Sequence, residues 1–122
     1  LECTAADDLP RLDEDAEEGI PRLGCGPAIT VMDRSFIADR RLVDILFDAA
    51  RVGNIPVQFK RPGLGGTDAG GIHLAREGVR AGVVSVPARF IHSPAAVLDL
   101  VDFWNAEKLV GATLSQLPQE NW

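Results

Sequence analysis

The sequence feature that most restricts the fold is a continuous apolar run, AGVVSVPA, at residues Ala81–Ala88. Such a run is typical of a strand that is covered on both faces, as in the middle of an α/β sheet. Two stretches with apolar residues at helical spacing flank it, over residues 39–53 and 99–117. Asp39 is placed to cap the first of these helices, and Gly53 is placed to end it. The sequence therefore predicts helices packed on a buried strand.

Three further strands and one further helix complete the predicted order. The strands are expected at Leu1–Ala6, Pro27–Asp33 and Ile55–Lys60. The helix is expected to begin at Thr67, as its N-cap, and to end at Gly78. The resulting order, β, β, α, β, α, β, α, predicts an α/β fold with a largely parallel sheet. The last helix of the chain has one apolar stripe, formed by Phe103, Ala106, Val110, Leu114 and Leu117.

Charge and composition exclude several classes of protein. The 122 residues carry a formal net charge of -6, and acidic residues are concentrated in Asp13–Glu18, which we interpret as a solvated loop. A nucleic-acid-binding protein would show a basic stripe instead, and no apolar stretch is long enough for a membrane helix. Cys3 and Cys25 fit no metal or redox spacing, so we expect reduced, buried thiols in a cytoplasmic protein.

Polar residues gather after three of the predicted strands. They are Glu2, Asp7 and Asp8 around the first strand, the loop GGTDAG at Gly65–Gly70, and ARFIHSP at Ala88–Pro94. In an open α/β sheet, ligands bind outside the carboxyl ends of the strands. If the sheet is parallel, these three loops converge and form a candidate site.

The glycine loop Gly65–Gly70 has one feature of a phosphate-binding turn, because it joins a strand to the start of a helix. Its spacing does not match, since Asp68 stands where a dinucleotide fingerprint has its third glycine, and the lysine of a P-loop is missing. The charge of Asp68 would also repel a phosphate. A nucleotide or small-molecule binder is therefore a disfavoured alternative, and a tight turn before a capped helix explains the loop.

The two histidines receive different interpretations. His92 lies just beyond the most apolar strand, where a neutral imidazole can serve as a metal ligand or general base. A hydrogen-bonded loop histidine is the open alternative. His73 lies inside the predicted helix, between Ile72 and Leu74, and we interpret it as structural.

Six segments occur in an order that resembles one protein family. They are ECTAADD, GCGPAITVMD, IPVQFK, GGTDAG, VVSVPARFIHSP and VLDLVDF. The series is similar to the C-terminal part of the FrvX-like glutamyl or deblocking aminopeptidases, which form tetrahedral assemblies and are often named endoglucanase or cellulase M. This resemblance implies a three-layer α/β/α zinc-peptidase-like sheet, of which residues 1–122 would be the C-terminal portion of the catalytic domain.

The resemblance also implies the chemistry. Such enzymes use two zinc or cobalt ions to remove N-terminal residues from peptides. Glu2 matches the carboxylate ligand of one metal ion, and His92 matches the imidazole ligand of the other. Matching positions near the site, which would support the ligands or contact substrate, are Thr67, Asp68 and Arg89. For these three residues, turn capping or a salt bridge is the open alternative.

The sequence departs from the family pattern in three ways. Phe90 stands where tyrosine is usual, and Gly71 stands where alanine is commoner. The family's other metal ligands (a histidine, a bridging aspartate and a glutamate), its general base and its inserted β-rich domain have no counterpart here, and the chain does not begin with methionine. We therefore expect a piece of a longer homo-oligomeric enzyme that is inactive by itself. The alternative is a non-catalytic interaction or assembly module with the same fold.

Overall fold

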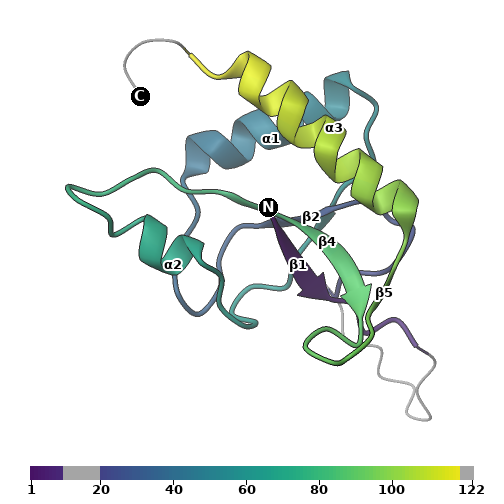
Figure 1. Cartoon of the computed structure of the whole chain (residues 1–122). Coiled ribbons are helices and arrows are strands. Elements are labelled where there is room, and N and C mark those ends of the chain that lie inside the picture. Colours follow the sequence, from purple (N-terminus) through teal and green to yellow (C-terminus); the bar gives the residue numbers. More distant parts are fainter. Residues whose placement is uncertain (10–19, 119–122) are drawn as a thin grey trace.

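The computed structural model describes residues 1–9 and 20–118 (Figure 1). Its elements are β1 (Glu2–Ala5), β2 (Ala28–Thr30), α1 (Arg40–Val52), β3 (Gln58–Phe59), α2 (Ala69–Ile72), β4 (Val83–Arg89), β5 (Val97–Leu98) and α3 (Leu100–Gln116). The predicted order of elements is confirmed, with β5 as one additional short strand. The predicted acidic loop, Asp13–Glu18, lies outside the described residues.

The sheet is mixed, so the prediction of a largely parallel sheet is wrong. Its strand order is β1-β4-β2-β3, with β5 paired to β4. The pairs β1–β4 and β2–β3 are parallel, whereas β2 runs antiparallel to β4. A parallel connection needs a crossover that returns the chain across the sheet, and α1 provides one between β2 and β3. The helix predicted over residues 67–78 is only Ala69–Ile72. No long helix thus lies between β3 and β4, and β4 runs in the opposite direction to β2.

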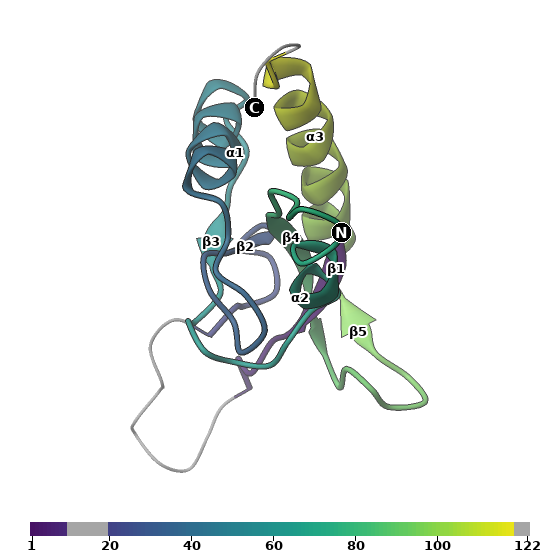
Figure 2. The same cartoon turned by 90° about the vertical axis from the view of Figure 1, so that its left-hand side faces the viewer.

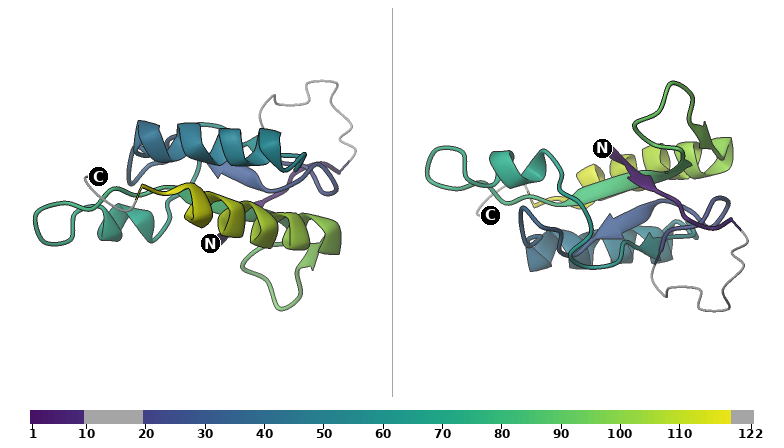
Figure 3. Two further views of the ribbon diagram at one scale, coloured as in Figure 1. Left: turned by 90° about the horizontal axis from the view of Figure 1, so that it is seen from above. Right: turned by 90° about the horizontal axis from the view of Figure 1, so that it is seen from below.

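The two long helices lie side by side on one face of the sheet (Figures 2 and 3). The core between them and the sheet contains Ile29, Leu46, Ala49, Val84 and Leu109. This arrangement confirms the predicted α/β class. The view from below in Figure 3 shows the strands in front of both helices, so neither long helix covers the other face.

Helix α1 begins as the sequence predicts. The Asp39 carboxylate accepts hydrogen bonds from the backbone N–H groups of Arg41, at 2.9 Å, and Leu42, at 3.2 Å. At the other end Gly53 is the C-cap, but the left-handed conformation belongs to the next residue, Asn54, with φ of 49°. Asparagine tolerates this region better than most residues do, so it can end the helix in place of glycine.

Helix α3 has the predicted bounds, but the face that it buries overlaps the predicted stripe only in part, at Ala106 and Val110. Its buried residues are Asp102, Ala106, Leu109 and Thr113. Phe103 and Leu114, which belong to the predicted stripe, are 45% and 62% exposed. A polar contact determines which face of α3 is buried. The Asp102 carboxylate accepts 2.7 Å hydrogen bonds from the backbone N–H groups of Gly24 and Gly26. This contact turns Asp102 towards the protein interior and Phe103 outwards.

Both cysteines are free and exposed, so the prediction of buried thiols is wrong. Cys3 lies on β1, which is the edge strand of the described sheet and is therefore only partly covered. Cys25 lies in the turn before β2. No helix among residues 1–9 and 20–118 is both long and apolar enough to cross a membrane.

Candidate functional site

The direction of the strands decides which of the predicted site residues meet. Glu2 begins β1 and is paired with Ser85, in the first half of β4. β2 and β3 run antiparallel to β4. The loops that follow β2 and β3 therefore lie at the same end of the strands as Glu2. Asp8 follows β1, and Arg89 is the last residue of β4, so both lie at the opposite end of the strands. The prediction that all three polar loops converge is therefore wrong, and the candidate residues form two groups.

The first group joins Glu2 to the glycine loop. The backbone N–H of Asp68 donates a hydrogen bond to Glu2 Oε1 at 3.2 Å. The hydroxyl of Thr67 donates to Asp33 Oδ2 at 2.9 Å, so it does not cap helix α2 as predicted. Asp68 is the N-cap of that helix but makes no capping hydrogen bond through its side chain. Three of the predicted residues thus lie together, and Asp33 joins them as a residue that the sequence did not single out.

Asp33 is the hub of this group. It is 6% exposed, and its Oδ1 accepts hydrogen bonds from Ser35 N and Ser35 Oγ, both at 2.7 Å, and from Phe36 N at 3.1 Å. Burial raises the pKa of Asp33, but the hydrogen bonds from Ser35, Thr67 and Phe36 together outweigh it, so that its pKa lies below the usual value. An aspartate two residues before a serine at the end of a strand is typical of such a turn and was the available signal.

We expect Asp33 to stabilise the fold more at neutral pH than in acid. Because its folded-state pKa is lowered, the unfolded chain takes up its proton first as the pH falls. The stabilisation is complete above the unfolded pKa of about 4 and is lost as the pH drops through the folded value. Urea unfolding of the parent and of Asp33→Asn, at several pH values from neutral to strongly acidic, measures the free energy of unfolding of each. The variant should be the less stable at neutral pH and approach the parent in acid, whereas a constant difference would contradict the assignment.

The second group is an ion pair between Arg89 and Asp8. Arg89 Nε donates to Asp8 Oδ1 at 2.6 Å, and the backbone N–H of Leu23 donates to Asp8 Oδ2 at 2.9 Å. The hydrogen bond from Arg89 is the main reason why the pKa of Asp8 is lowered, and Asp8 in turn raises the pKa of Arg89. The salt-bridge alternative for Arg89 is therefore what the structure shows. The pair ties the end of β4 to the segment that follows β1.

His92 lies in an exposed turn beyond the end of β4, not at the strand end itself. Both Phe90 and His92 have a left-handed backbone, with φ of 59° and 65°. For residues other than glycine this conformation is uncommon and costs about 1–3 kcal/mol, which is typical of positions where geometry serves a function. Among the described residues, no hydrogen bond or ion pair joins His92 to Glu2. The structure therefore brings Glu2 together with Thr67 and Asp68 but leaves His92 apart.

His73 has the structural role that the sequence predicts. It is half-buried, and its Nδ1 lies 2.9 Å from the carbonyl oxygen of Ala69. Its ring packs near Phe36, with the ring centroids 6.0 Å apart. The imidazole is thus occupied by its own helix and by the core.

A carboxylate and an imidazole are suitable ligands for zinc or cobalt, so Glu2 and His92 fit a divalent metal in kind. They do not fit in number. In the described part of the chain, no group of three or more His, Cys, Asp or Glu side chains could hold a metal ion. A complete metal centre would therefore need ligands from outside these residues.

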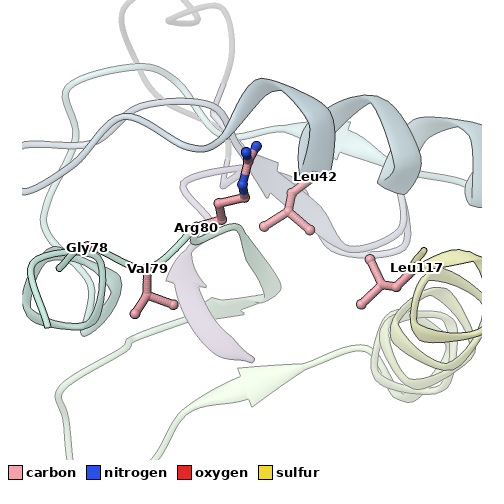
Figure 4. Close-up of a pocket in the computed structure, with 5 residues that line it drawn as sticks. All are labelled: Leu42, Gly78, Val79, Arg80 and Leu117. Atoms are coloured by element: carbon pink, nitrogen blue, oxygen red, sulfur yellow. The ribbon is translucent and has the colours of Figure 1, made fainter. Parts of the chain in front are cut away.

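An apolar trough borders the outer edge of β1. A pocket of about 760 Å³ lies there, and its apolar lining is Leu1, Val86, Leu98, Phe103, Trp104 and Ala106. A neighbouring pocket of about 180 Å³ shares Leu1 with it and shares Leu42 and Leu117 with a third pocket of about 460 Å³. Figure 4 shows this third pocket, where Leu42 lies on α1 and Leu117 follows the end of α3, and where Gly78, Val79 and Arg80 form the remaining lining. The first two pockets lie along α3, and the third lies beside the C-cap of α3.

Comparison with known proteins gives a consistent result. The sequence profile described as M42 glutamyl aminopeptidase matches residues 1–109. The lysyl aminopeptidase of Pyrococcus furiosus is 36% identical over 99 residues, which are 80% of this chain and 28% of that protein.

Solved structures agree with the sequence match. Aminopeptidase APDkam598 from the archaeon Desulfurococcus kamchatkensis shows 39% identity and a TM-score of 0.85, covering 94% of this chain and 32% of that one. The Pyrococcus horikoshii TET1 peptidase, which can assemble into a tetrahedron or a large octahedral shell, shows 29% identity and a TM-score of 0.70, covering 94% of this chain and 32% of its own. The chain thus spans about a third of the length of these relatives.

Proposed function

This chain belongs to the M42 glutamyl aminopeptidase family, and from that membership we propose that it forms one part of a metal-dependent aminopeptidase that removes N-terminal residues from peptides. The observation that carries the proposal is the family match over residues 1–109. The shared fold with an aminopeptidase at a TM-score of 0.85 supports it. A cytoplasmic location and the absence of nucleic-acid and membrane partners stay predictions.

In this proposal Glu2 and His92 each supply one ligand to a different divalent ion of a two-metal centre. Two such ions, when bound, would provide a hydroxide nucleophile at neutral pH and hold the attacking and leaving atoms. Glu2 is suited to its role because a backbone N–H already orients one of its oxygens. Thr67 and Asp68 hold the loop beside Glu2. The remaining ligands and the general base come from polypeptide outside these 122 residues, so we propose that the chain alone is inactive.

The apolar trough supports the same proposal. Soluble monomers rarely leave large apolar patches uncovered, and here Phe103 is 45% exposed and Trp104 53% exposed beside the edge strand β1. We propose that the rest of the catalytic domain packs against this surface. The same surface would also suit the alternative function, a non-catalytic assembly module. A homo-oligomer is proposed by analogy with the assembly of the P. horikoshii peptidase.

A zinc titration by calorimetry tests the ligand assignment, with His92→Ala as the variant and His73→Ala as its matched control. Two isolated protein ligands leave most of the coordination shell to water, so we expect weak binding of less than two equivalents. His92→Ala should weaken that binding by at least about tenfold, while His73→Ala leaves it unchanged.

Hydrolysis of leucine and glutamate anilides in the same samples tests the activity of the chain. We expect no turnover in any of them. Tight binding of two equivalents with turnover would contradict the proposal that ligands are missing. Equal loss of zinc binding in His92→Ala and His73→Ala would contradict the role of His92.

A further inference from the structure

The turn after β2 and the loop after β3 are joined into one unit. The backbone N–H of Arg34 donates to Gly65 O at 2.8 Å, and that of Gly63 donates to Met32 O at 3.3 Å. The backbone N–H of Thr67 also approaches the Ser35 hydroxyl, at 3.3 Å. These contacts link residues about thirty positions apart in sequence, so the position of the glycine loop depends on the turn after β2.

Close packing reinforces this link. A Cβ added at Gly70 would lie 2.4 Å from the Cβ of Ser35, a distance that real side chains do not tolerate. At Gly66 an added Cβ would lie 3.5 Å from the Ser35 hydroxyl oxygen. Gly70 thus lets the loop approach Ser35 closely, whereas a side chain at position 66 would be in ordinary contact with it. Ser35 is itself bound to Asp33 at 2.7 Å.

The strongest single contact across the two segments is the hydrogen bond from Thr67 Oγ1 to Asp33 Oδ2, at 2.9 Å. A hydrogen bond to an ionised carboxylate is stronger than one between neutral groups. The residue after Thr67 is Asp68, whose backbone N–H donates to Glu2 Oε1 at 3.2 Å. A path of two hydrogen bonds and one peptide unit therefore runs from Asp33 to Glu2.

We propose that Asp33 is a positioning residue that acts through Thr67 to hold the Asp68 N–H against Glu2 and so fixes the orientation of the Glu2 carboxylate. The inference rests on the proposed function in one respect, which is that the oriented Glu2 carboxylate would serve as a metal ligand. Glu2 lies on an edge strand and is half-buried, and its long side chain has several rotatable bonds. A rigid N–H donor selects one orientation of a metal-binding carboxylate, as outer contacts do in metal sites generally.

The test is a double-mutant cycle read by NMR of the 122-residue chain. Glu2→Gln replaces the charged acceptor of the Asp68 amide, so it should shift the Asp68 backbone amide resonance in the parent. Thr67→Val removes the hydroxyl that binds Asp33 while keeping the shape of the side chain. In the Thr67→Val background, Glu2→Gln should shift the Asp68 resonance by less than about a third as much, because coupled residues are not additive. Thr67→Ser keeps the hydroxyl and should restore the full shift.

Unchanged amide resonances in α1 and α3 show that each variant is folded, and Asp33→Asn tests the same hydrogen bond from its other end. A full Glu2→Gln shift in both the Thr67→Val and the Asp33→Asn backgrounds would overturn the inference. The zinc titration separates this result from the proposed function. If Glu2→Gln leaves zinc binding as it is in the parent while the cycle gives the expected coupling, the positioning role stands and the ligand role of Glu2 fails.

Discussion

Asp102→Ala is expected to lower the free energy of unfolding by about 3–5 kcal/mol. The Asp102 carboxylate is 0% exposed and accepts two 2.7 Å hydrogen bonds, from Gly24 N and Gly26 N. A hydrogen bond to a charged group contributes about 1.5–3 kcal/mol, and alanine leaves both donors without their acceptor. The two bonds also connect α3 to the turn before β2. Urea unfolding followed by circular dichroism at neutral pH measures the loss.

Asp44→Ala is the matched control for this prediction. Asp44 also lies on a helix and binds a cationic partner, Arg40, at 3.0 Å, but the side chains of this pair are 87% and 56% exposed. Exposed ion pairs contribute little, so the control should change stability by less than about 1 kcal/mol. Similar losses in Asp102→Ala and Asp44→Ala would show that the buried carboxylate does not anchor the turn.

Gly26→Ala is expected to have an equally large effect, of about 3 kcal/mol or more, or to prevent folding. Gly26 has φ of 88°, and a Cβ added there would lie 2.0 Å from the carbonyl oxygen of Pro56. The neighbouring atoms belong to the backbone, so no side-chain movement can relieve the overlap. The segment before β3 would have to move away, although Gln58 N donates to Pro27 O at 3.0 Å. Thermal and urea unfolding measure the effect.

Gly63→Ala separates the overlap from backbone strain. Gly63 has a similar φ of 79°, but nothing lies within 4 Å of an added Cβ. The left-handed conformation alone should cost about 1–2 kcal/mol. If Gly26→Ala costs no more than Gly63→Ala, the close approach to Pro56 is not important for stability.

Local signals in the sequence predicted the elements that depend on local interactions. Asp39 was predicted to cap α1, and its carboxylate accepts hydrogen bonds from the first turn of that helix. The last helix was expected to start at about Asp99, which is the N-cap of α3. The run Ala81–Ala88 predicted β4, which is buried along most of its length between β1 and β2. Each of these signals is contained within a few neighbouring residues.

The features that the sequence did not predict depend on partners far away in the chain. The buried face of α3 is decided by Asp102 and the turn at Gly24–Gly26, more than seventy residues earlier. Hydropathy favoured Phe103 for this face. The periodicity of apolar residues along a helix contains no information about N–H donors elsewhere in the chain, such as those of Gly24 and Gly26. The antiparallel pairing of β2 with β4 was missed for a related reason, since Ala28–Thr30 pairs with residues more than fifty positions later in the chain.

The candidate site divides in the same way. The resemblance to a family placed Glu2, Thr67 and Asp68 near one another, and the structure brings them together. Asp33 was missed because a single aspartate after a strand is commonplace until the residues that bind it are known. The metal-ligand roles of Glu2 and His92 stay predictions, which zinc titrations of Glu2→Gln and His92→Ala address.

The position of β1 at the edge of the sheet has a practical consequence. An unpaired strand edge beside apolar side chains is a template on which other chains can add, as in the early steps of aggregation. When the chain is produced by itself, we therefore expect it to aggregate increasingly as its concentration rises. Natural proteins protect such edges with charged residues, and Cys3, an exposed residue in the middle of β1, is a suitable place for lysine. This is also the edge beside which we propose that the rest of the catalytic domain packs.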